Sequence, residues 1–267
     1  MAVVAIQKPK PRPAGRGGEV LLEISRLEKA FPNGTQALRG IDLKLSAGEL
    51  TVVLGANGSG KSTLLRCLVR LIDPTGGSVH VNGSDLAHLD GIALREARRA
   101  VAMVFQHANL VRRRTALANV IMGALAGYDD WKTALGFLPS AEREPARRCL
   151  ERVGLAHVAG QRADTLSGGQ AQRVAIARGL NQRPRVLLAD EPVASLDPEA
   201  AEEVMSLLLA LAENEGLAVL CVLHQPDLAV RYGHRIIGMR DGRIVFDQPA
   251  QSVDRDAVDM LYRGEAA

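Results

Sequence analysis

The chain has 267 residues, which is enough for one domain or for one core with a lobe inserted into it. Its 33 Lys and Arg residues nearly balance its 30 Asp and Glu residues, so the net charge of +3 gives no reason to expect a nucleic-acid partner. The cysteines, Cys67, Cys149 and Cys221, are odd in number and far apart. This spacing argues against a disulfide framework or a metal cluster and favours a reducing cytoplasm.

No apolar run approaches the ~20 residues that a membrane-spanning helix needs. Residues 1–18 carry Lys, Arg, Pro and Gly but lack the hydrophobic segment of a secretory signal. We predict a disordered basic arm over 1–18, and we expect any role at a membrane to depend on a partner.

Short apolar runs alternate with segments of helical period, a pattern that predicts a layered α/β core. The strands are expected, in chain order, at Glu19–Ser25, Ile41–Leu45, Glu49–Leu54, Val79–Val81, Val101–Phe105, Val186–Ala189, Ala218–Leu223, Arg235–Met239 and Arg243–Phe246. A helix is expected from Lys61, and Thr115–Leu180 is predicted to be mostly helical. This helical stretch indicates a lobe inserted between two halves of the core.

A glycine-rich loop follows the predicted strand Glu49–Leu54. Residues 55–62 fit the pattern G-x-x-x-x-G-K-[ST], and an amphipathic helix comes next. The glycines allow backbone N–H groups to turn inward around phosphate oxygens, and the amino terminus of the helix favours an anion. Lys61 would reach the terminal phosphates, and the Ser62 hydroxyl would bind Mg²⁺. The predicted contacts with ATP are Gly55, Ala56, Asn57, Gly58, Ser59, Gly60, Lys61, Ser62 and Thr63.

Two carboxylates follow a second buried strand, Val186–Ala189. Ligands bind at the carboxyl ends of strands in open α/β sheets, so this position suits a second part of the same site. Asp190 is expected to hold Mg²⁺, and Glu191 is expected to orient and deprotonate the attacking water. Adjacent carboxylates repel each other unless a cation or a raised pKa relieves them.

A second phosphate cradle is predicted where Ser167, Gly168 and Gly169 open a helix that begins near Gln170. One ATP does not need two separate cradles, whereas a site shared between two copies of the chain does. The pentapeptide from Leu166 to Gln170 resembles the signature of the ABC-type ATPases. A small-molecule kinase would not need this second cradle.

Further positions match that family in order along residues 20–250. Phe31 resembles the aromatic residue that stacks on adenine, and Gln106 resembles the glutamine that senses phosphate and Mg²⁺. Asp197 belongs to a segment similar to the D-loop, and His224 resembles the histidine that contacts the γ-phosphate. The resemblance implies Glu191, His224 and Gln106 as catalytic residues, and Ser62, Gln106 and Asp190 as residues that bind the metal.

The resemblance also implies how the chain is divided. We expect a P-loop NTPase core of the ABC type, with an amino-terminal antiparallel β part and an inserted helical subdomain. The predicted parts after the arm are the first part of the nucleotide-binding core (19–106), the helical signature subdomain (107–178), the second part of the core (179–250) and a helical carboxyl-terminal tail (251–267).

Smaller details resemble the ATPase subunits of phosphonate importers. Val-Ala-Ser stands at 193–195 where Thr-Ser-Gly is commoner, and Gln225 follows His224 where Asp is commoner. Residues 127–139 look like an insertion of that subgroup. Whether this segment packs within the lobe or recognises a permease is left open.

The partners that the family implies are a second copy of the chain, two integral membrane permease subunits and a periplasmic or extracellular substrate-binding protein. The expected place is the cytoplasmic face of the cell membrane, and no nucleic acid is expected. Two alternatives stay open: an ATPase accessory to a phosphonate-degrading complex, and an importer ATPase for another small solute. DNA-repair and translation members of the family carry long coiled-coil insertions or two cassettes, and this sequence has neither.

Overall fold

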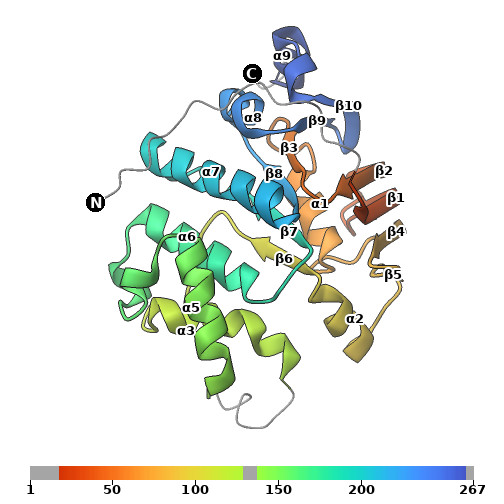
Figure 1. Ribbon diagram of the computed structural model, residues 1–267. Helices are drawn as coiled ribbons and strands as arrows, with labels where there is room; N and C mark the ends of the chain where they lie inside the picture. Colours follow the sequence, from red (N-terminus) through yellow and green to blue (C-terminus); the bar gives the residue numbers. More distant parts are fainter. Residues whose placement is uncertain (1–17, 129–136, 263–267) are drawn as a thin grey trace.

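Two β-sheets form the centre of the molecule in the computed structural model, which describes residues 18–128 and 137–262 (Figure 1). The larger sheet has the order β10-β9-β3-β8-β7-β6 and is parallel except for β10. Its strands are β3 (Leu50–Leu54), β6 (Val101–Val104), β7 (Val186–Asp190), β8 (Ala218–Val222), β9 (Arg235–Arg240) and β10 (Arg243–Pro249). The smaller sheet is antiparallel, with the order β2-β1-β4-β5. Its strands are β1 (Val20–Ala30), β2 (Gln36–Ser46), β4 (Gly76–Val81) and β5 (Ser84–Asp85).

The nine predicted strands are confirmed, but the first two are longer than predicted: β2 begins at Gln36, five residues before the predicted start at Ile41, and β1 is extended at its end. This strand runs on to Ala30, five residues beyond the predicted end at Ser25. The pairing with β2 shifts register between Ile24 and Leu27, and Arg26 has a positive φ of 46°. Such a bulge breaks the alternation of apolar residues, which is why the sequence pattern ends before the strand does.

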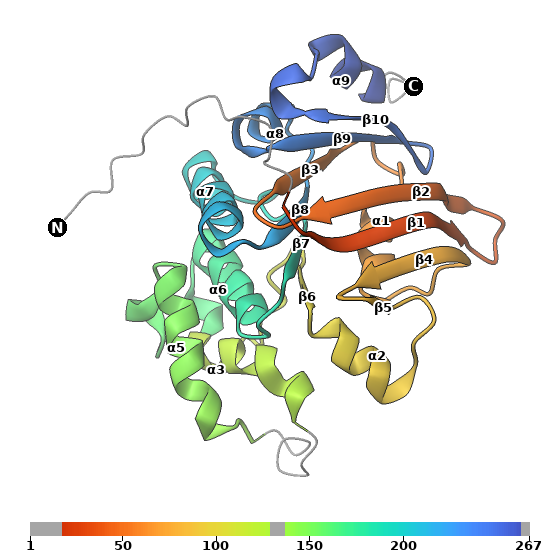
Figure 2. The ribbon, with the colours of Figure 1, turned by 45° about the vertical axis from the view of Figure 1, so that its right-hand side comes forward.

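The helix α1 (Lys61–Leu68) lies between the two sheets, and three other helices cover the opposite face of the parallel sheet (Figure 2). The covering helices are α6 (Gly168–Leu180), α7 (Pro198–Glu215) and α8 (Pro226–Tyr232). The chain closes with η5 (Ala250–Ser252) and α9 (Arg255–Tyr262). A further helix, α2 (Gly91–Arg98), precedes β6 and was not predicted.

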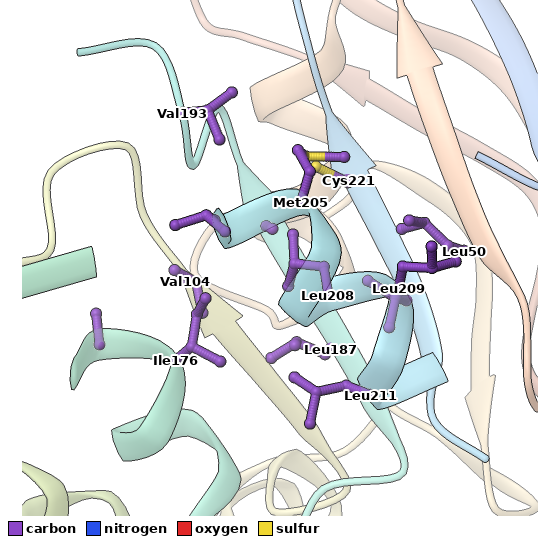
Figure 3. Packing of buried hydrophobic residues seen from close by; sticks show 14 of the residues in the cluster. Leu50, Val104, Ile176, Leu187, Val193, Met205, Leu208, Leu209, Leu211 and Cys221 are labelled. Carbon is purple, nitrogen blue, oxygen red and sulfur yellow. The ribbon is translucent and has the colours of Figure 1, made fainter. Parts of the chain in front are cut away.

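Both faces of the parallel sheet are buried, because successive strand residues point to opposite sides. In β7, Leu188 belongs to the apolar cluster around α1, whereas Leu187 belongs to the cluster under the covering helices. Figure 3 shows Leu187 facing Leu208 and Leu211 of α7. The strand is therefore apolar at nearly every position, as strands covered on both faces are.

The segment predicted to be mostly helical forms a group of short helices beside β6 (Figure 1). They are α3 (Ala116–Ile121), η1 (Met122–Gly127), η2 (Ser140–Glu142), α5 (Arg143–Arg152), η3 (Ala156–Val158) and η4 (Ala163–Thr165), and α6 joins them. Side chains of α6 tie this group to the end of β6. Gln172 donates to the Phe105 carbonyl oxygen (3.1 Å), and Arg178 donates to the Ala108 and Asn109 carbonyl oxygens (2.9 and 2.7 Å).

The division into 19–106, 107–178, 179–250 and 251–267 stays a prediction, and its boundary at 178 falls inside α6. Residues 1–17 of the predicted arm and residues 129–136 of the predicted insertion lie outside the described residues. None of the helices in the described ranges is both long and apolar enough to cross a lipid bilayer.

Candidate active site

Four neighbouring strands of the parallel sheet end at one edge, and each is followed by residues predicted to be functional. The loop 55–63 follows β3, Asp190 ends β7, His224 comes after β8 and Gln106 comes after β6. The parallel pairing of these strands keeps their carboxyl ends level. This is the edge at which open α/β sheets bind ligands.

The loop 55–63 turns sharply into α1, and its last glycine makes the turn possible. Gly60 is the N-cap of α1 and has a left-handed backbone with φ of 101°. A Cβ atom at this position would lie 2.5 Å from the carbonyl oxygen of Ala37, so no other residue fits. The first N–H groups of α1 therefore face the loop, where they can bind phosphate oxygens.

Lys61 is only 5% exposed, although it carries a full charge. Its Nζ donates to the carbonyl oxygens of Gly55 (2.7 Å) and Ala56 (2.8 Å), and it lies 3.4 Å from Ser59 Oγ. The ammonium group is thus held against the backbone of the loop itself. A phosphate anion entering the loop would meet a cation that is already desolvated and oriented.

Ser62 and Asp190 bring the loop and β7 into direct contact. Ser62 Oγ donates to Asp190 Oδ1 at 2.9 Å, and Asp190 is only 6% exposed. Burial raises the pKa of Asp190; the bond from Ser62 opposes this change, and the neighbouring Glu191 charge adds to it. A hydroxyl and a buried carboxylate side by side are hard oxygen ligands of the kind that Mg²⁺ prefers, so this pair fits a magnesium ion.

Glu191 and His224 form a second pair at the same edge. His224 Nε2 lies 2.5 Å from Glu191 Oε1, so with a proton on Nε2 the imidazole donates to the carboxylate. Glu191 has a positive φ of 49°, which is uncommon outside glycine. Strained backbone of this kind occurs at functional sites where the surrounding structure holds it in place.

A cleft of about 440 Å³ opens over the loop. Its lining includes Phe31, the loop residues from Asn57 to Thr63, and Glu191. The predicted adenine platform, phosphate loop and general base therefore meet around one cleft. Gln106 is exposed and lies beyond the described lining of this cleft.

The predicted second cradle lies elsewhere on the chain. Ser167 caps α6: its Oγ accepts from the backbone N–H of Gln170 (3.2 Å), and its own N–H donates to Gln170 Oε1 (3.0 Å). A Cβ atom at Gly169 would lie 2.9 Å from Cβ of Ala200, so this glycine lets α6 approach α7 closely. Ser167 and Gly168 do not belong to the described lining of the cleft.

Asp197 has a structural role within the chain. Its Oδ1 accepts from the backbone N–H of Ala200 at 2.9 Å, which caps the amino terminus of α7. The structure shows this cap, and the predicted contact of Asp197 with nucleotide stays a prediction.

The hairpin between β9 and β10 supports the phosphate loop, a role that the sequence did not reveal. The N–H of Gly242 donates to the Ser59 carbonyl oxygen (3.1 Å), and the Gly242 carbonyl oxygen accepts from the N–H of Arg39 (2.9 Å). A Cβ atom at Gly242, where φ is 74°, would lie 2.7 Å from the Ala37 carbonyl oxygen. The sequence signal was the Asp241–Gly242 turn, but the pattern alone cannot show what a turn touches.

Comparison with known proteins identifies a family model and several similar proteins. The family model described as ABC transporter matches residues 38–194, more than half of the chain. The phosphonates import ATP-binding protein PhnC 1 of Ruegeria sp. (strain TM1040) is 45% identical over 247 residues, which cover 92% of this chain and 96% of that protein. The phosphonates import ATP-binding protein PhnC of Bdellovibrio bacteriovorus is 45% identical over 250 residues, which cover 93% and 95%.

Solved structures of ATP-binding cassettes are similar to this chain in fold. A dimeric ATP-binding cassette in a post-hydrolysis state, bound to ADP and Pi, superposes with a TM-score of 0.75 and 33% identity, covering 87% of this chain and all of that one. The ADP conformation of an ATP-binding cassette of an ABC transporter superposes with a TM-score of 0.80 and 26% identity, covering 92% and 99%.

The buried charge of Asp190 predicts that Asp190→Asn stabilises the chain in the absence of metal and nucleotide. Because burial raises the pKa of Asp190, the native state binds more protons than the unfolded state, and stability falls as pH rises through this window. Asn carries no charge and still accepts from Ser62. The gain in free energy of unfolding should therefore be small near pH ~4 and larger near neutral pH.

Urea unfolding in the presence of a chelator would measure this difference. The matched control is Asp259→Asn, an exposed position on α9, which should change stability little at any pH. If the Asp190→Asn chain were less stable than the wild-type chain at neutral pH, the prediction would be wrong.

Proposed function

The chain belongs to the ABC transporter family of ATP-binding proteins, and we propose that it is the ATP-hydrolysing subunit of an importer for phosphonates or related phosphorus oxyanions. As an ABC ATPase it binds ATP. The observation that supports the proposed substrate class is the 45% identity, over more than 90% of both chains, to proteins named for phosphonate import. The sequence details at residues 193–195 and Gln225 support the same subgroup.

The hydrolytic step is assigned to Glu191. A water molecule between Glu191 and the γ-phosphate loses its proton to the carboxylate as its oxygen attacks phosphorus and ADP departs. The 2.5 Å contact with His224 orients the carboxylate, and it supports the proposed contact of His224 with the γ-phosphate. Gln106 completes the proposed catalytic group from the end of β6.

The phosphates are assigned to the loop 55–63. Backbone N–H groups at the start of α1 take the phosphate oxygens, and Lys61 exchanges its contacts with loop carbonyl oxygens for contacts with phosphate. Ser62 and Asp190, with Gln106 as a further ligand, would hold Mg²⁺, which supplies neutralisation of the phosphate charge. Phe31 offers its ring to adenine from the edge of the same cleft.

The complete site is proposed to need two copies of the chain. Ser167 and Gly168 lie at the amino terminus of α6, outside the described lining of the cleft of their own chain. In a head-to-tail dimer, Ser167–Gln170 of one copy would close over the nucleotide held by the other. The solved dimeric cassette to which this chain is similar supports such an assembly.

The transporter is proposed to contain two integral membrane permease subunits and a periplasmic or extracellular binding protein, with this chain at the cytoplasmic face of the membrane. ATP contacts both halves of the dimer, so it can shift an equilibrium between open and closed dimers, which hydrolysis reverses. Gln106 stands between the end of β6 and the helices of the inserted segment. Gln106 is therefore the residue proposed to transmit closure of the ATPase dimer to the permease subunits.

The role of Glu191 predicts that Glu191→Gln binds MgATP but loses most hydrolysis. The amide keeps the shape of the side chain and cannot accept the proton, and loss of a general base costs roughly 10²–10⁴ in rate. Steady-state release of phosphate and nucleotide titration would measure the two effects separately. Glu199→Gln, in the exposed first turn of α7, is the control and should hydrolyse normally. Near-normal turnover by the Glu191→Gln chain would remove Glu191 from this role.

The shared site predicts that two inactive variants recover activity when they are mixed. A dimer of one Lys61→Ala chain and one Ser167→Arg chain has one intact site and one doubly damaged site. If the sites act independently, an equal mixture should reach at most about a quarter of wild-type activity. Phosphate release before and after mixing is the measurement, and each variant alone is its own control. Undiminished hydrolysis by Ser167→Arg alone would contradict the shared site.

The proposed cargo predicts a growth defect. A cell that lacks this chain should fail to grow on a phosphonate as the sole source of phosphorus and should still grow on inorganic phosphate. The wild-type gene should restore growth, and the Glu191→Gln gene should not.

In the reconstituted transporter, binding protein loaded with such an anion should raise ATPase activity. Stimulation by a loaded sugar- or amino-acid-binding protein would overturn the phosphonate assignment and leave the family unchanged.

A further inference from the structure

Phe31, the proposed adenine platform, has a lysine beside its ring. Phe31 lies directly after β1, in a turn closed by hydrogen bonds from Phe31 N–H to the Thr35 carbonyl oxygen and from Gly34 N–H to the Phe31 carbonyl oxygen, both 2.9 Å. Lys29 lies two residues earlier on β1, and its Nζ is 5.2 Å from the centroid of the Phe31 ring. This distance is within the range of a cation–π contact.

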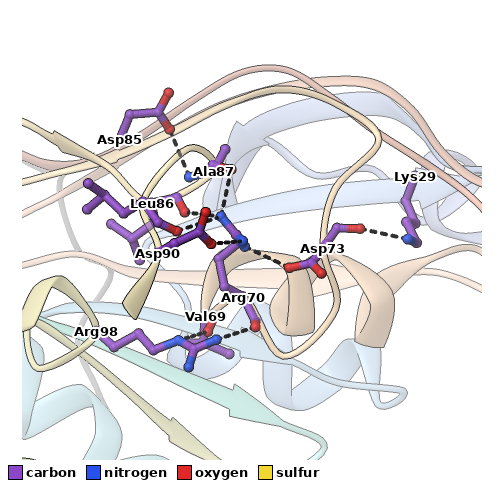
Figure 4. Close-up of polar contacts among 10 residues, drawn as sticks. Lys29, Val69, Arg70, Asp73, Asp85, Leu86, Ala87, Asp90 and Arg98 are labelled. Carbon is purple, nitrogen blue, oxygen red and sulfur yellow. Dashed lines mark hydrogen bonds and ion pairs between the residues drawn. The ribbon is translucent and has the colours of Figure 1, made fainter. Parts of the chain in front are cut away.

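The ammonium group of Lys29 is fixed from its other side. Nζ donates to the carbonyl oxygen of Asp73 at 2.6 Å (Figure 4). Two further bonds hold the same segment against β1: Ala30 N–H donates to Thr75 Oγ1 (3.1 Å), and Thr75 N–H donates to the Glu28 carbonyl oxygen (2.8 Å). Lys29 is therefore part of a rigid contact rather than a freely moving surface side chain.

Asp73 belongs to the segment that follows α1, and Arg70 of the same segment holds its side chain in place. Arg70 Nε donates to Asp73 Oδ1 (2.9 Å), and Arg70 Nη1 donates to the carbonyl oxygens of Leu86 and Ala87, both at 2.6 Å (Figure 4). The helix α1 begins in the phosphate loop and ends at Leu68. The ring that receives the base and the loop that receives the phosphates are thus connected through one short stretch of chain.

Phe31 lines the cleft, and Lys29 does not belong to its described lining. The ammonium group lies over the ring, so a flat base that enters from the cleft would have to stack on the face away from Lys29. A ring held in advance loses less conformational freedom when the base stacks on it.

We propose that Lys29 is a positioning residue for the nucleotide base: it holds Phe31 between its own ammonium group and the cleft. The proposal rests on the assignment of Phe31 as the adenine platform, which is part of the proposed function. Lys29 lies outside the described lining of the cleft that holds the phosphate loop and Glu191, so we expect it to act on nucleotide affinity and not on the rate of the chemical step.

The test is a double-mutant cycle on the full-length chain with MgADP as the probe. Lys29→Met keeps the length of the side chain and removes its charge, and it should raise the Kd for MgADP about three- to tenfold. The same change in a Phe31→Ala background should have no further effect, because the ring that Lys29 holds is gone. Magnesium tripolyphosphate, which has no base, should bind Lys29→Met and the wild-type chain equally well. Lys29→Arg should restore most of the affinity for MgADP. In steady-state hydrolysis, Lys29→Met should raise the KM for MgATP by a larger factor than it changes kcat.

Lys44→Met is the matched control, because Lys44 is an exposed lysine on β2 that pairs with Glu23 (2.8 Å). It should leave the Kd for MgADP unchanged. Weaker binding of tripolyphosphate by Lys29→Met, or an undiminished effect in the Phe31→Ala background, would show a general structural role and overturn the proposal. An unchanged Kd in Phe31→Ala alone would overturn the platform itself. Neither result bears on transport, so failure here is distinguishable from failure of the importer assignment.

Discussion

The hydrogen bond from Ser62 to Asp190 joins two segments that are 128 positions apart in the chain, and the active site depends on it. It fixes the start of α1 against the end of β7, and the phosphate loop and Glu191 line the same cleft. Its cost is a buried carboxylate, whose pKa is raised by burial. Under the proposed function this charge is needed only when a cation and phosphates are bound, so the site would lower the stability of the protein without ligands.

The other residues at this edge of the parallel sheet are brought together by the pairing of the strands. Parallel pairing places the ends of β3, β6, β7 and β8 at one edge of the sheet, and the chain leaves each strand through a residue predicted to be functional. Glu191 accepts a positive φ at this point and is held by His224. The strain is local, and the buried strands β7 and β8 beneath it supply the rigidity that keeps it in place.

Support for the site comes from elements that lie outside the proposed chemistry. The β9–β10 hairpin braces the phosphate loop through Gly242, and the segment after α1 braces Phe31 through Lys29. The signature segment, by contrast, is braced within its own chain by its capping box and by the close approach of Gly169 to Ala200.

The sequence by itself determined the fold class and the nine strands, because short apolar runs and helical periods are local patterns. It determined the family because the motif at residues 55–62 stands between a predicted strand and a predicted helix, and the motif at residues 166–170 occurs in the same chain. It missed the continuation of β1 past a bulge, because a register shift leaves no alternation to follow. It also could not show that Gly242 supports Ser59, or that Asp73 holds Lys29 against Phe31. These contacts join positions far apart in the chain, through backbone atoms that every residue possesses. Only the packing of the two sheets around α1 decided which of those atoms would meet.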